Sequence, residues 1–66
     1  MRSHDSKYKI ILGFKLKHFR LQADLSLQEL ARKTGLSFPY ISQIEQGKKY
    51  PKPEKIALLG QALGKS

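Results

Sequence analysis

Apolar residues recur at helical spacing near both ends of the chain. One stripe of a first predicted helix, which we expect to end near Gln22, carries Tyr8, Leu12, Leu16, Phe19 and Ala23. A last predicted helix carries Ile56, Leu59 and Leu63 on one face. Side chains three and four positions apart share one side of a helix, so we expect both stripes to face a core.

The segment 26–47 contains the start and stop signals of two further helices. Ser26 and Glu29 have the capping-box spacing, in which the hydroxyl and the carboxylate each accept a hydrogen bond from a backbone N–H at the helix start. Gly35 supplies the left-handed backbone that ends a helix. Ser37 offers a second N-cap, and Gly47 a second stop. The sequence therefore predicts an all-α fold of four helices, with a fifth left open.

The chain divides into a short polar start and one domain. We expect residues 1–6 to be flexible, with Asp5 or Ser6 as a cap for the first helix, and residues 7–64 to form the domain. Asp24 should turn the chain after the first helix, because Asp tolerates a left-handed backbone. The lysines and prolines of residues 48–53 predict a loop.

A helix, a turn containing glycine and a second helix form the layout of DNA-binding helix-turn-helix units. The chain resembles the phage-repressor (Cro/C1-type, or XRE) family from Leu12 to Gly64, through LGFKLKHFR, the L-x-x-LA-x-x-x-G-x-S core, YISQIEQG and ALLGQALG. The resemblance implies a small helical bundle that binds double-stranded DNA in a sequence-specific manner as part of a transcriptional regulator. Residues 37–46 would form the recognition helix in the major groove, and the helix-turn-helix unit would span 26–47.

Charge and composition agree with this interpretation. The chain has 66 residues and a net charge of +8, which suits one domain with a polyanionic partner, nucleic acid first and an anionic membrane second. It has no cysteine, so disulfides and thiolate metal sites are excluded. Because the sequence shows neither a signal-peptide pattern nor a run of about 18 apolar residues, we expect a soluble cytoplasmic protein and no membrane partner.

Helical geometry divides the predicted recognition helix into two sides, with Ile41 and Ile44 pointing inward. The outward side carries the expected base-contacting residues Phe38, Pro39, Ser42 and Gln43. The amide of Gln43 can pair with adenine N6 and N7 together, and the ring of Phe38 can contact a thymine methyl. The alternative for Phe38 is that it covers an edge of the core.

A second group of polar residues is expected to contact phosphates, which supply affinity but no sequence discrimination. Its members are Gln28, Ser37, Tyr40, Gln46, Lys48, Lys49 and Lys52. Similar proteins carry a phosphate-binding Gln at the position of Leu27, so Gln28 is included as its substitute. The alternative for the lysines is a solvated loop with no ligand.

The resemblance also implies an ion pair between Arg20, at the end of the first helix, and Glu45, in the recognition helix. Such a pair would orient the recognition helix. The alternative is two unrelated surface charges, which contribute about 0–1 kcal/mol.

Some apolar residues lie outside the core stripes. Ile10, Phe14 and Leu21 lie about 180° from the core stripe of the first helix, and Leu58 also points outward on the last. They predict a homodimer face or a docking site for a missing C-terminal domain, against the alternative of isolated surface hydrophobes.

Enzyme and metal motifs are weak. The segment GQALGKS, residues 60–66, has three residues where a phosphate-binding loop needs four, and His4 and His18 lack the spacing of a zinc site. We therefore expect no enzyme, metal or cofactor. Two other functions stay open: the DNA-binding antitoxin of a toxin–antitoxin pair, and a basic module that binds a protein or membrane through the first helix.

Overall fold

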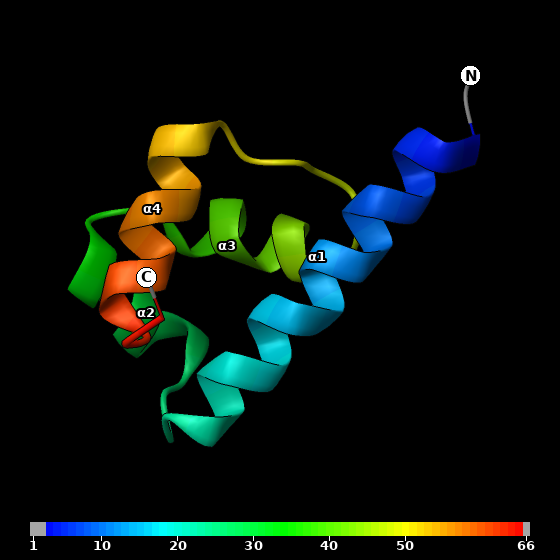
Figure 1. Ribbon diagram of the computed structural model, residues 1–66. Coiled ribbons are helices and arrows are strands. Elements are labelled where there is room, and N and C mark those ends of the chain that lie inside the picture. The colour runs from blue at the N-terminus through cyan, green and yellow to red at the C-terminus, as the bar shows by residue number, and fades with distance from the viewer. Residues whose placement is uncertain (1–2, 66) are drawn as a thin grey trace.

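The computed structural model describes residues 3–65, and this part of the chain folds into helices without a strand (Figure 1). The helices are α1 (Ser3–Gln22), α2 (Leu27–Thr34), α3 (Phe38–Glu45) and α4 (Pro53–Ala62). The predicted all-α fold of four helices is thus confirmed over these residues. The long α1 packs mainly on α3, whereas α2 packs on both α3 and α4.

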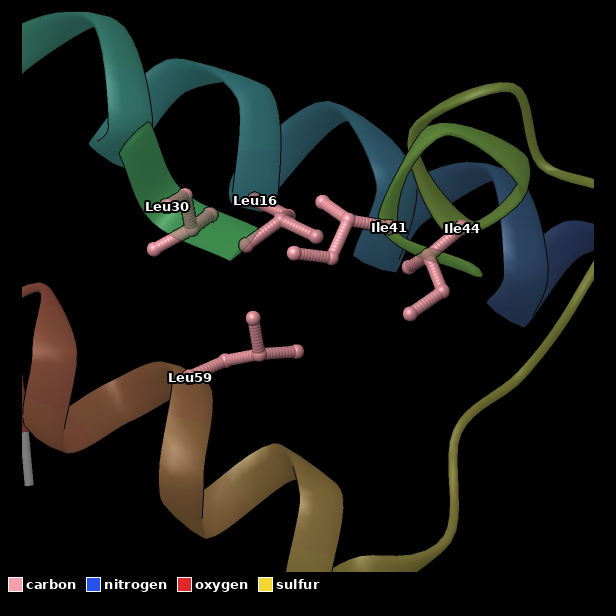
Figure 2. Packing of buried hydrophobic residues seen from close by; sticks show 5 residues of the cluster. All are labelled: Leu16, Leu30, Ile41, Ile44 and Leu59. Carbon is pink, nitrogen blue, oxygen red and sulfur yellow. The ribbon is translucent and has the colours of Figure 1, made fainter. Parts of the chain in front are cut away.

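The core is small and draws on every helix. Figure 2 shows its members, Leu16 of α1, Leu30 of α2, Ile41 and Ile44 of α3, and Leu59 of α4. Leu30 and the two isoleucines are completely buried. For the isoleucines, this confirms the predicted inner side of α3. Burial of each such side chain contributes about 1.5–3 kcal/mol, so α3 is fixed chiefly through its inner face.

The predicted core stripe of α1 is only partly correct. Leu16 is buried and Leu12 packs against the core, but Tyr8 is 58% exposed and Ala23 is also exposed. The N-terminal turns of α1 extend past the other helices (Figure 1), so the core stripe does not continue to the start of this helix. Ala23 follows the last residue of α1, where the chain has already turned away.

The beginning of α1 also differs from the expectation. The helix begins at Ser3, so Asp5 and Ser6 lie inside it and do not cap it. Residues 1–2 of the expected flexible segment lie outside the described residues. The predicted turn after α1 is present, since Asp24 has a left-handed backbone with φ of 59°.

Gly13 sets the distance between α1 and α3, a role that the sequence did not reveal. A Cβ atom at this buried position would lie 2.5 Å from the carbonyl oxygen of Ile44 and 2.9 Å from that of Glu45. Only a residue without a side chain permits this approach. The backbone of α1 therefore lies directly against the C-terminal end of α3.

Candidate nucleic-acid interface

The start of α2 is fixed by a complete capping box. The Ser26 hydroxyl accepts a hydrogen bond from the Glu29 backbone N–H at 3.0 Å, and the Glu29 carboxylate accepts one from the Ser26 N–H at 2.7 Å. Hydrogen bonding to the carboxylate by Ser26, chiefly by its backbone N–H, holds the pKa of Glu29 below its usual value, because it stabilises the charged form. Gln28 is exposed in this first turn, where a phosphate contact was expected.

The turn between α2 and α3 combines a predicted glycine with an unpredicted threonine. Gly35 has φ of 78°, and its N–H donates to the carbonyl of Ala31 at 2.8 Å. The Thr34 hydroxyl donates to the Leu30 carbonyl at 2.8 Å and accepts from the Leu36 N–H at 3.2 Å. These bonds close the end of α2 and direct the chain into α3.

The N-terminus of α3 has the predicted cap. The Ser37 hydroxyl accepts a hydrogen bond from the Tyr40 N–H at 3.2 Å, and Pro39 lies in the first turn. The Ser37 O–H can still donate a hydrogen bond to a phosphate oxygen. This turn lies at the positive end of the helix dipole, which favours an anion, although Pro39 has no N–H and the Tyr40 N–H already donates to Ser37.

The expected pair of Arg20 and Glu45 is present and buried. The Arg20 Nε donates to Glu45 Oε2 at 2.7 Å, and the second guanidinium contact reaches Oε1 at 3.0 Å. Both side chains are only 8% exposed. The hydrogen bond to Glu45 raises the pKa of Arg20 above its usual value. A further bond, at 2.8 Å to the carbonyl of Leu25, ties the same guanidinium to the α1–α2 turn and was not predicted.

The outer side of α3 is open to solvent. Phe38 is 42% exposed, Pro39 and Gln43 are also exposed, and Ser42 is half-buried. In the part of the chain that the structure describes, the Gln43 amide has no hydrogen-bond partner. Ser42 is different, because its hydroxyl accepts a bond from the Gln46 amide at 2.9 Å. The four expected base-contacting residues thus leave one free amide and one exposed aromatic ring on the same short helix.

The expected phosphate-contacting residues lie in varied surroundings. Tyr40 is half-buried against the core, and the ammonium of Lys49 lies 5.2 Å from the centre of its ring. Gln46, Lys48 and Lys52 are exposed around the C-terminal end of α3 and the loop that follows. The loop therefore presents exposed positive charge after the C-terminal end of α3.

The expected partner surface consists of exposed side chains. Phe14 is 70% exposed, Leu21 55%, Ile10 48% and Leu58 38%. Ile10 also approaches the chain at Gly47, where an added Cβ atom would lie 3.2 Å from its Cγ1. The first three form one stripe on α1, whereas Leu58 belongs to α4.

Other functional signals are weak within residues 3–65. None of these helices is long and apolar enough to cross a membrane. The described acidic and histidine side chains form no group that suits a metal ion.

The capped α2–α3 unit, with its inner side buried and its outer side free, defines a helix-turn-helix DNA-binding domain. Comparison with family models gives the same result, because the model described as "Helix-turn-helix" matches residues 16–66. The chain belongs to this family, and its Cro/C1-type (XRE) resemblance is confirmed. A domain of this class is a DNA-binding domain and not an enzyme.

A solved structure supports the assignment. The chain is similar to the clp gene regulator ClgR from C. glutamicum, with 36% sequence identity and a TM-score of 0.84. The match covers 88% of this chain and 74% of the ClgR chain. A comparison with curated protein sequences finds no match.

Proposed function

We propose that this domain binds double-stranded DNA in a sequence-specific manner as part of a transcriptional regulator, with α3 in the major groove. The observation that carries the proposal is the asymmetry of α3. Ile41 and Ile44 are completely buried on one side, whereas Gln43 and Phe38 are exposed on the other. The major groove, about 12 Å wide, admits a helix whose outer side is free in this way.

The residues of this surface divide into two roles. Gln43 is proposed to pair with adenine, and Phe38 to contact a thymine methyl, while Pro39 and Ser42 adjoin the base edges. The phosphate contacts are assigned to Gln28, Ser37, Tyr40, Gln46, Lys48, Lys49 and Lys52, with the N-terminus of α3 adding its dipole. The Arg20–Glu45 pair is proposed to fix the angle at which α3 enters the groove.

The regulatory role is supported by the similarity to ClgR, whose description is that of a gene regulator. We infer further that the domain acts in the cytoplasm as a dimer on pseudo-palindromic half-sites. The exposed stripe of Ile10, Phe14 and Leu21 supports this, because an exposed apolar patch marks a protein contact. Phe14 is the centre of the proposed dimer face.

Selection of bound sequences from a random duplex pool tests the specificity directly. A recovered motif shared by independent clones is the expected result. Salt dependence provides the second measurement: if about six phosphates are contacted, a plot of log affinity against log salt should have a slope near −5. Binding to vesicles of anionic lipid that equals or exceeds binding to duplex DNA would refute the proposal.

A further inference from the structure

An apolar groove of about 430 Å³ lies between α1 and α4. It exists because α1 packs mainly on α3 and α4 packs on α2, so that the facing sides of α1 and α4 stand apart. Ile44 of α3 contributes to the lining between them. Leu59 points toward Leu16 and Ile44 from the opposite side in Figure 2.

The groove has the form of a binding site for a helix. Its walls include Leu12 and Phe19 of α1, and Ile56 and Leu63, which are all only partly buried. From Leu12 to Phe19 the wall runs for two turns of α1, about 10 Å. A wall of this length matches the spacing of apolar anchors at positions i, i+3, i+4 and i+7 of a bound amphipathic helix.

The rim of the groove is positively charged. Lys15 and Lys65 are the only ionisable residues among the lining residues, and both are exposed. The Lys65 ammonium lies 4.7 Å from the centre of the Phe19 ring, and neither lysine is paired with a carboxylate among residues 3–65. Both charges are therefore available to a partner with carboxylates next to its apolar anchors.

We propose that the groove binds an amphipathic helix with acidic flanks, supplied by a partner protein. A second copy of this chain fits less well, because it carries 13 Lys and Arg against 5 Asp and Glu and would bring like charges to the rim. From α3 the groove uses only Ile44, on the buried side, so Gln43 stays open to DNA while the groove is occupied. The groove and the DNA-contacting surface are thus two separate sites.

The probe is a capped, fluorescein-labelled peptide of about 14 residues, with Leu at helical anchor spacing and Glu elsewhere. Fluorescence anisotropy with the 66-residue chain should give saturable binding. A peptide with the same composition in scrambled order, and one with Lys in place of Glu, should bind at least about tenfold more weakly. Equal binding of the scrambled peptide, or no saturable binding of the probe, would overturn the proposal.

Matched variants locate the contact. Ala57→Glu places a charge and added bulk in the groove and should weaken probe binding about tenfold, whereas Ile11→Glu, at an exposed position outside the groove, should leave it unchanged. Lys15→Glu should weaken it about fivefold and Lys17→Glu should not. Circular dichroism must show a helical content equal to that of the parent. If a groove variant and its control weaken probe binding equally, an acidic partner helix is excluded. It is also excluded if the chain self-associates through the groove and Ala57→Glu disrupts that association.

Discussion

Arg20 and Glu45 are 25 positions apart in the sequence, yet their side chains meet in a two-point ion pair that joins the end of α1 to the end of α3. The pair is nearly excluded from solvent. A charge left unpaired at this buried position would therefore be poorly hydrated. Together with the Arg20 bond to the Leu25 carbonyl, it joins α1, the following turn and α3 in one polar cluster. The rigidity of the recognition helix should therefore depend on both partners.

Removal of one partner should strongly destabilise the fold. Glu45→Ala leaves the Arg20 guanidinium buried without its carboxylate, which costs about 3–5 kcal/mol. Urea denaturation gives the free energy of unfolding. Glu54→Ala, at an exposed position, is the control and should change it by no more than about 0.5 kcal/mol. Similar free energies for the two variants would show that the pair contributes little.

Gly13→Ala should destabilise the protein, although the same change within a helix is usually favourable by about 1 kcal/mol. The added methyl group would overlap the carbonyl oxygens of Ile44 and Glu45 and force α1 from α3, at a cost of about 1–3 kcal/mol. Thermal melting measures the loss. Lys17→Ala, an exposed change on the same helix, serves as control, and a Gly13→Ala melting temperature at or above that of the parent would contradict the close approach.

The capping box gives one component of stability a defined pH dependence. The pKa of Glu29 is lowered in the folded state, so its contribution is complete above the unfolded pKa of about 4.3 and is lost as the pH falls through the lower folded value. Glu29→Gln keeps a capping residue but cannot titrate. The free energies of unfolding of the parent and of Glu29→Gln, measured between neutral pH and pH 2, should differ less as the pH falls. A constant difference would argue against the linkage.

Two substitutions should separate base contacts from phosphate contacts. Gln43→Ala should relax the preference at one base pair by about 1–3 kcal/mol and leave other positions unchanged. Lys48→Ala should weaken binding to every duplex alike and reduce the salt slope by about 1. Titration of a panel of single-substitution duplexes at several salt concentrations measures both effects. The opposite pattern would reverse the two assignments.

The proposed dimer face can be tested by one charge. Phe14→Glu should convert a concentration-dependent dimer into a monomer in sedimentation equilibrium, because a buried unpaired carboxylate opposes association. Leu58→Glu adds the same charge on α4, outside the α1 stripe, and is the matched control. If Leu58→Glu alone abolishes the dimer, the face belongs to α4.

The parts of the fold that sequence could predict are those set by local chemistry. The limits of α2 and α3 follow from Ser26, Gly35 and Ser37, whose effects act within one helical turn. The Arg20–Glu45 pair was predicted only through the family resemblance, since no local rule joins positions so far apart. Features that depend on how helices approach one another were not accessible. Gly13 has no side chain to form a pattern, and Tyr8 fits the stripe of α1 but is exposed, because the stripe does not show how far the neighbouring helices extend along α1.

The one-sided packing of α3 has an evolutionary consequence. Residues that hold the helix in place, such as Ile41 and Ile44, differ from those that face outward, such as Phe38 and Gln43. Surface substitutions away from caps and buried networks usually change stability by no more than about 0.5 kcal/mol. New operator preferences can therefore arise by drift at the outward positions while the scaffold retains its fold.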